Sequence, residues 1–255
     1  MTLDLHAHVL PAVDDGPDSI EDSLALLRAL QAEGVETVAA TPHVHPAYPT
    51  SVAMRDERLS LVRQAAANAG LTIEVVQGGE IDLEYAASYD DDQIGAWALG
   101  GGPAVLVEFP WGPTWPLALA PTCRDLRLRG FLPIVAHPER ARPVQQRPER
   151  LDDVIASGAV CQITNGSLAG RFGETAQRTA FALLRERRGH LIASDAHGAA
   201  SRSPSFTGAR KALAHEFGPD YAAAIESAAA EVYEGRMPQL PHLPAEPRRR
   251  GLFRR

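Results

Sequence analysis

The chain has 255 residues, a formal net charge of −7, 45% hydrophobic residues and 22% charged residues. This composition fits a globular protein that buries its core without disulfides, and the acidic balance disfavours nucleic acid as the main partner. The two cysteines, Cys123 and Cys161, form no CxxC or zinc-knuckle pattern, which indicates reduced thiols. Because neither a signal-peptide pattern nor an 18-residue apolar run occurs, we expect a cytoplasmic protein without a membrane span.

Short apolar runs alternate with helical patterns along the chain. Ser19 and Asp22 form a capping pattern that begins the first helix, and Gly34 ends it. Strands are predicted at seven apolar runs: 3–6, 35–40, 71–76, 104–108, 131–136, 159–164 and 191–194. Further helices are predicted near 52–69, 117–129, 151–156, 175–187 and 218–234.

The repeated strand–helix order predicts an α/β fold with a parallel sheet. Seven such units, with no glycine-rich dinucleotide turn after the first strand, favour a closed barrel over an open doubly wound sheet. We expect one domain over residues 1–235 and a tail rich in proline and arginine over 236–255. The five arginines of residues 247–255 are typical of a solvated end, and a weak contact with anionic lipid or an acidic partner is the alternative.

Metal-capable side chains follow nearly every predicted strand. They are His6, His8, Asp15, His43, Glu80, Glu108, His137, Asp195 and His197. The C-terminal ends of barrel strands converge on one face, so we expect these nine side chains to lie together. Imidazole and carboxylate ligands without thiolate suit zinc, manganese or iron, and nine ligands exceed the need of one ion. Clustered cations acidify a bridging water and hold phosphoryl oxygens, which favours metal-assisted hydrolysis of a phosphate ester.

Two arginines close to this set, Arg140 and Arg202, are candidates for binding a substrate phosphate, although either could be an ordinary surface residue. One of the adjacent residues Asp14 and Asp15 is interpreted as a turn or capping residue, and His45 as a loop residue. Glu139 fits two roles, orienting a ligand histidine or capping a helix.

The tryptophans near the Glu108 loop also fit two roles. Trp97, Trp111 and Trp115 could pack at the core or rim, or they could form a wall for an aromatic substrate.

Seven segments resemble the PHP superfamily (polymerase and histidinol phosphatase), and within it the manganese-dependent bacterial protein-tyrosine phosphatases of capsule and exopolysaccharide loci. The segments are 4–8 (Asp-Leu-His-Ala-His), 13–17, 40–43, 79–80, 107–110, 136–140 (Ala-His-Pro-Glu-Arg) and 193–197 (Ala-Ser-Asp-Ala-His). Residues 166–173 and the basic tail resemble the same branch, and the match covers the chain to about residue 217.

The resemblance implies a distorted seven-stranded, TIM-like (β/α)7 barrel with a trinuclear site, Mn²⁺ being the expected metal and Fe or Zn the alternatives. It implies that one ion takes His6, His8, Glu80 and Asp195, that Glu80 bridges to a second ion held by Glu108 and His137, and that the third takes Asp15, His43 and His197.

The implied activity is hydrolysis of phosphotyrosine by a metal-bound hydroxide, since no Cys-x5-Arg motif is present to supply a cysteine nucleophile. Arg140 and Arg202 match the arginines that act on the phosphate in this branch. The implied substrate is a bacterial tyrosine autokinase that controls polysaccharide export. A small-molecule phosphatase such as histidinol-phosphatase is the main alternative, and a non-catalytic binding barrel and a nuclease stay open.

Overall fold

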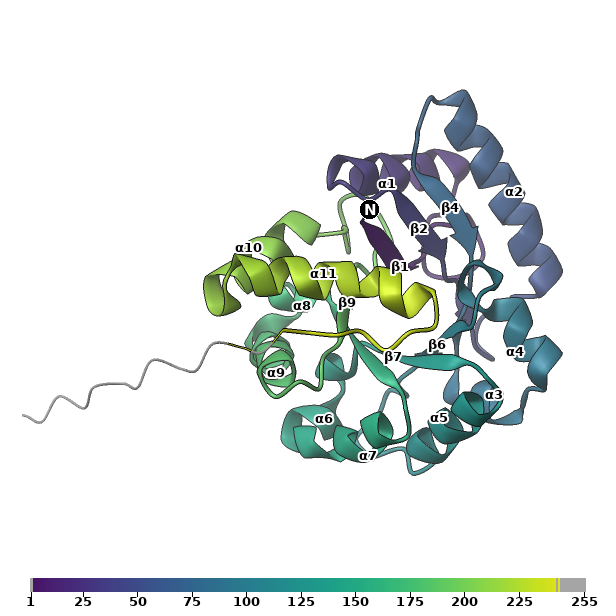
Figure 1. The fold of residues 1–255 in the computed structure, drawn as a ribbon. Helices are drawn as coiled ribbons and strands as arrows, with labels where there is room; N and C mark the ends of the chain where they lie inside the picture. The colour runs from purple at the N-terminus through teal and green to yellow at the C-terminus, as the bar shows by residue number, and fades with distance from the viewer. Residues whose placement is uncertain (1, 242, 244–255) are drawn as a thin grey trace, which may run out of the picture.

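The computed structural model describes residues 2–241 and 243, which form an α/β fold with two parallel sheets (Figure 1). The first sheet has the order β1 (Leu3–Ala7), β2 (Thr37–Ala40), β4 (Glu74–Gln77). The second has the order β3 (His43–Val44), β5 (Glu80–Ile81), β6 (Ala104–Glu108), β7 (Leu132–Ala136), β8 (Val160–Thr164), β9 (Leu191–Ala193). All seven predicted strand runs lie on strands, so the α/β class and the parallel pairing are confirmed.

The second and third predicted strands are each interrupted, and each continues in the other sheet. Thr41 and Pro42 separate β2 from β3, and Gly78 and Gly79 separate β4 from β5. The breaks are close-packed: a Cβ on Gly79 would lie 2.6 Å from the Trp97 ring. Strands of two residues carry no hydrophobic period, so the sequence did not predict β3 and β5.

Helices cover the outer faces of the strands (Figure 1). They are α1 (Ile20–Ala32), α2 (Val52–Asn68), α3 (Leu83–Ser88), α4 (Asp91–Trp97), α5 (Leu119–Leu128), α6 (Arg142–Gln146), α7 (Leu151–Ala156), α8 (Asn165–Leu168), α9 (Gly173–Arg185), α10 (Phe206–Phe217) and α11 (Pro219–Tyr233). The predicted helices are confirmed to within two residues, and Ser19 caps α1 by accepting the Asp22 N–H. Helices α3, α4, α6, α8 and α10 were not predicted.

Apolar side chains from the first residues of several strands meet α11, which runs across β1 and β9 (Figure 1). This inner cluster consists of Leu3, Leu5, Ala39, Val76, Leu99, Ala104, Leu106, Leu132, Ile134, Ala136, Val160, Leu191, Ala228, Ala229 and Val232. Because these side chains are apolar and buried, the inner cluster contributes hydrophobic stability and carries no group that could take part in a reaction.

Part of the expected tail packs against the body of the protein. Leu240 and Leu243 lie against the hydrophobic core, and Arg187 Nη2 donates to the Leu240 carbonyl at 3.0 Å. The rest of the expected tail, at 242 and 244–255, lies outside the described residues. Among the described helices, none is long and apolar enough to cross a bilayer.

Candidate metal centre

His6 lies in β1 and His8 directly after it, and the segment after β9 carries Asp195 and His197; hydrogen bonds between the two backbones bring these pairs together. The Asp195 N–H donates to the His6 carbonyl and the His8 N–H donates to the Ala196 carbonyl, both at 2.8 Å. Asp4, buried beneath them, accepts the Ser194 N–H at 2.9 Å and the Ser194 hydroxyl at 2.5 Å. Strand β1 and the segment after β9, which are far apart in sequence, are therefore held side by side by hydrogen bonds.

Glu80 lies at the centre of the nine predicted ligands, here called the ligand cluster. Its Oε2 is 3.3 Å from His6 Nε2, 3.4 Å from His8 Nε2 and 3.1 Å from His43 Nδ1. Its Oε1 is 2.9 Å from His137 Nε2. One fully buried carboxylate thus contacts four imidazoles, as expected of a ligand shared between cations.

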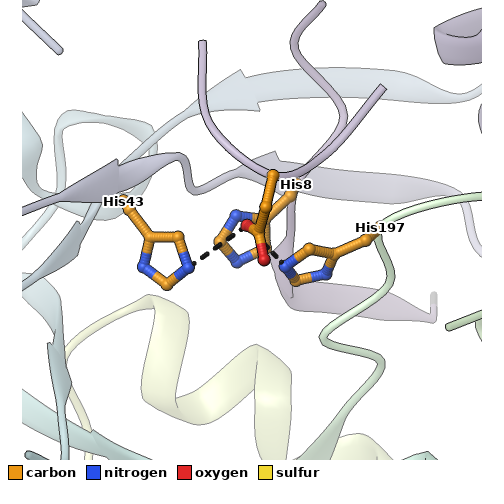
Figure 2. A group of neighbouring side chains, drawn as sticks. His8, His43 and His197 are labelled. Carbon is orange, nitrogen blue, oxygen red and sulfur yellow. Dashed lines mark ion pairs between the residues drawn. The ribbon is translucent and has the colours of Figure 1, made fainter. Parts of the chain in front are cut away.

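Asp15, His43 and His197 gather around His8 on the outer side of the cluster. Figure 2 shows the rings of His43 and His197 on either side of His8. Asp15 Oδ1 is 3.4 Å from His43 Nε2 and 3.1 Å from His197 Nε2, and the His197 ring stacks on His8 with centroids 3.9 Å apart.

Candidate ligand atoms fall into three groups in which every atom is within 4.8 Å of the others. The groups are His6, His8, Glu80; His8, Asp15, His43, His197; and His43, Glu80, Glu108. The first two agree with the division implied by the resemblance, apart from the place of Asp195 and the addition of His8. The third places Glu108 beside His43, where the resemblance implies His137.

Four buried atoms of the cluster lie close to other charged groups but make no hydrogen bond of good geometry with any described residue: His43 Nδ1, Glu80 Oε2, Asp195 Oδ1 and His197 Nε2. A buried polar atom without a partner costs free energy, and the concentration of four such atoms in one cluster calls for a bound group that would satisfy them. These four belong to residues that face one another across the cluster. Their nitrogen and oxygen donors fit divalent cations, which would satisfy all four.

Burial and neighbouring charges drive the histidine pKa values apart. Burial lowers the pKa of His8, but the bonded Asp14 carboxylate outweighs it and raises this pKa to about 9. Burial also lowers the pKa of His43, but the Asp15 and Glu108 carboxylates outweigh burial and raise this pKa to about 11. Burial and the charge of His8 lower the pKa of His197 to about 4. Protons therefore compete with cations for His8 and His43.

Both candidate phosphate arginines reach the same carboxylate oxygen at the edge of the cluster. Asp195 Oδ2 accepts from Arg140 Nη1 at 2.6 Å and from Arg202 Nη2 at 2.8 Å. The other oxygen, Oδ1, lies 3.5 Å from His6 Nε2. Asp195 thus links the ligand cluster to the arginines, and it does so from a left-handed backbone conformation with φ +50°.

Two residues that contact histidines of the ligand cluster were not assigned this role from the sequence. Asp14 Oδ2 lies 2.6 Å from His8 Nδ1 and accepts the His43 N–H at 2.9 Å. Gln162 Oε1, on β8, lies 3.1 Å from His6 Nδ1 and accepts the His137 N–H at 3.2 Å. Such partners fix the ring and tautomer of a ligand. Asp14 also accepts the Gly16 N–H, so its predicted role in a turn is correct but incomplete.

Two of the remaining candidates, Glu139 and His45, have structural roles. Glu139 is buried and accepts the Thr164 N–H at 3.0 Å and the Ser167 hydroxyl at 2.7 Å, so it ties the 138–140 turn to the start of α8. His45 Nδ1 accepts the Ala47 N–H within its loop. Trp97 is buried in the core, whereas Trp111 is 56% exposed.

The ligand cluster opens into a cavity of about 380 Å³. Its lining includes both arginines and six of the nine residues of the ligand cluster, together with Tyr48 and Trp111. A larger groove of about 530 Å³ lies between α5 and α7 and is lined by no residue of the ligand cluster. The smaller cavity is therefore the candidate for substrate.

Residues 2–232 match the family described as capsular polysaccharide synthesis, CpsB/CapC. The chain belongs to this family. Its CpsB/CapC relatives include tyrosine-protein phosphatase YwqE of Bacillus subtilis, 32% identical over 219 residues, with 86% of each chain covered. Tyrosine-protein phosphatase CpsB of Streptococcus pneumoniae is 27% identical over 222 residues, covering 85% of this chain and 91% of the relative.

A solved structure from this family has the same fold. It comes from work on YwqE of Bacillus subtilis and CpsB of Streptococcus pneumoniae, described as unique metal-dependent tyrosine phosphatases. The TM-score is 0.85 at 30% identity, covering 95% of this chain and 99% of the other. The resemblance to capsule phosphatases expected from the sequence is confirmed.

Proposed function

We propose that this CpsB/CapC family member is a metal-dependent protein-tyrosine phosphatase of capsule or exopolysaccharide production. The observation that carries the proposal is the ligand cluster with its four unbonded buried atoms, in one cavity with two arginines. The names of the relatives, tyrosine-protein phosphatases over most of the chain, support the same activity.

The nine residues of the ligand cluster would hold up to three cations, in groups close to those seen among the ligand atoms. Manganese is the proposed metal, and iron and zinc suit the same donors. When bound, the cations supply an acidified water and hold the oxygens of the phosphoryl group. Asp14 and Gln162 would keep the histidine rings turned toward them.

The two arginines would bind the phosphate beside the cations. Each donates one N–H to Asp195, and a guanidinium has five N–H donors, so both keep donors for phosphate oxygens. Because the shared carboxylate already holds both side chains, little conformational entropy is lost when the substrate binds.

The proposal includes a closed seven-stranded barrel. The bridge between Ala7 and Ala196 joins β1 to the segment after β9, and β2/β3 and β4/β5 would each count as one interrupted strand. We place this single domain at residues 1–235 and the tail at 236–255. The proposed substrate is a phosphotyrosine protein, a bacterial tyrosine kinase, in the cytoplasm.

The test is phosphate release by protein purified without chelator and supplied with manganese. A phosphotyrosine peptide, a phosphoserine peptide and histidinol phosphate are compared, with His137→Ala as the inactive control. We expect manganese-dependent release from phosphotyrosine that the variant lacks. Faster release from histidinol phosphate would overturn the tyrosine phosphatase assignment and keep the metal centre.

A further inference from the structure

The guanidinium of Arg140 packs against two aromatic rings that come from different parts of the chain. Its Cζ lies 4.9 Å from the ring centroid of Trp111, in the loop between β6 and α5, and 4.2 Å from that of Phe172, just before α9. With these rings in place, only 16% of the Arg140 side chain is exposed. Arg202 binds the same Asp195 oxygen, but no ring lies over it among residues 2–241 and 243.

We propose that Trp111 and Phe172 are positioning residues that hold Arg140 in the orientation that binds the substrate phosphate. The inference rests on the proposed function, because it takes Arg140 as a phosphate ligand. An aromatic face attracts a guanidinium and leaves the N–H groups in its plane free. The rings thus restrain Arg140 without using the donors that Asp195 and a phosphate require.

Trp111 is held by polar contacts rather than by burial, since more than half of it is exposed. Its Nε1–H donates to Glu108 Oε1 at 2.7 Å, and its ring stacks on His137 with centroids 5.3 Å apart. Packing in the hydrophobic core does not explain the position of Trp111, because most of its side chain is exposed. One exposed tryptophan contacts Arg140 and two members of the ligand cluster, which suits a residue that couples the phosphate arginine to the metal ligands.

Phe172 depends on a glycine for its position. A Cβ on Gly166, in α8, would lie 2.7 Å from Phe172 Cε2 and 3.3 Å from Cδ2. The backbone of Gly166 is not left-handed, so space for the ring is what excludes a side chain there. Gly166→Ala is therefore expected to displace Phe172 while it replaces no side chain that lines the cavity.

The experiment compares ring variants with Gly95→Ala as the matched control. Gly95 lies in α4, where an added Cβ meets nothing within 4 Å. For each manganese-loaded protein, isothermal titration gives the Kd of inorganic phosphate, and kinetics on a phosphotyrosine peptide give KM and kcat. Metal content and thermal melting are measured alongside, to show that each variant is folded and loaded.

We expect Phe172→Leu and Gly166→Ala to weaken phosphate binding about tenfold and to raise KM more than they lower kcat. Trp111→Ala is expected to do the same and to reduce metal content as well, because Glu108 loses its partner. Trp111→Phe, which keeps a ring but no N–H, should recover much of the phosphate affinity and not the metal content. Gly95→Ala should match the wild type.

The deciding measurement is a double-mutant cycle with Arg140→Ala. If the rings act through Arg140, Phe172→Leu has no further effect on phosphate Kd in that background. An equal effect in both backgrounds, or wild-type phosphate affinity in the ring variants, would overturn the inference and leave the proposed function intact. A wild-type protein that neither binds phosphate nor hydrolyses phosphotyrosine would overturn both.

Discussion

The two ends of the same strands are built in opposite ways. In β6, Leu106 belongs to the inner cluster and Glu108, two residues later on the same face, belongs to the ligand cluster; in β1, the first residue, Leu3, belongs to the inner cluster and His6 to the ligand cluster. Apolar packing against α11 stabilises the inner end. The outer end buries carboxylates and imidazoles with unbonded atoms, which costs stability until cations bind.

Histidine shows the contrast most directly. At the outer end, the Asp14 carboxylate overcomes burial and raises the pKa of His8 to about 9. No carboxylate of residues 2–241 and 243 pairs with His190, just before β9, and burial lowers its pKa to about 4. The same side chain is thus a basic group in one region and a neutral structural group in the other. Stability and chemistry should therefore respond to mutation separately.

The largest expected effect is at the centre of the ligand cluster. Glu80→Gln removes the carboxylate that contacts four histidines, so we expect loss of bound metal and phosphatase activity lower by on the order of a thousandfold. Metal analysis and kcat on a phosphotyrosine peptide measure both. Glu84→Gln, on the exposed side of α3, is the matched control and should retain full activity. Retained metal in Glu80→Gln would contradict the central role of this residue.

A substitution in the inner cluster is expected to change the free energy of unfolding by a comparable amount and to leave the activity unchanged. Leu132→Ala leaves a cavity in the inner cluster and should lower the free energy of unfolding by about 3 kcal/mol. Urea denaturation measures this loss. At temperatures where the variant is folded, kcat should match the wild type, and a kcat that falls with stability would mean that the two ends are not independent.

A smaller effect is expected one step away from the ligands. Asp14→Asn weakens the charge that orients His8, so affinity for manganese should fall about 10- to 100-fold. Titration of the metal-free protein with manganese gives the affinity. Asp18→Asn, an exposed change four residues away, serves as control. Equal affinities in the two variants would leave Asp14 with its turn role only.

The smallest expected effect is a pH dependence at the inner end. His190 Nδ1 accepts the Cys161 N–H at 3.0 Å, so the folded protein holds this ring neutral down to about pH 4, whereas the unfolded chain protonates it near pH 6.5. Between these values the unfolded state binds more protons, and stability falls as the pH falls, by about 2 kcal/mol. His190→Asn keeps an acceptor and should flatten this part of the curve in urea denaturation from pH 7 to 4.5. An unchanged slope would assign the dependence to other groups.

The sequence predicts most strands, and the side chains that meet in the ligand cluster, because both have local signals. An apolar run that ends in His, Asp or Glu is visible without the fold, as at Ala136 and His137. Only the second halves of the two interrupted strands, β3 and β5, were missed, because each is two residues long. Helix α10 was not predicted, because the apolar residues of 206–217 were not recognised as a helical pattern.

Other features depend on which residues meet in space. Gln162 reads as part of a buried strand, and nothing near it in sequence marks the His6 ring that it contacts. From the sequence, Trp111 fitted either packing at the rim of the core or a wall for an aromatic substrate. Only the structure shows that it contacts Arg140 and Glu108. Tertiary partners separated by many residues leave no periodic signal.

The seam between β1 and the segment after β9 also sets the order in which the protein can become functional. Asp4 and Ser194, which bond across it, are 190 positions apart, and His6 and His8 meet Asp195 there. Contacts of such sequence separation form late, because most of the chain must be ordered before they close. During synthesis, the nascent chain therefore lacks a complete centre until residue 197 has left the ribosome. A cation that needs residues from both sides of this seam can therefore be held fully only after the seam has closed.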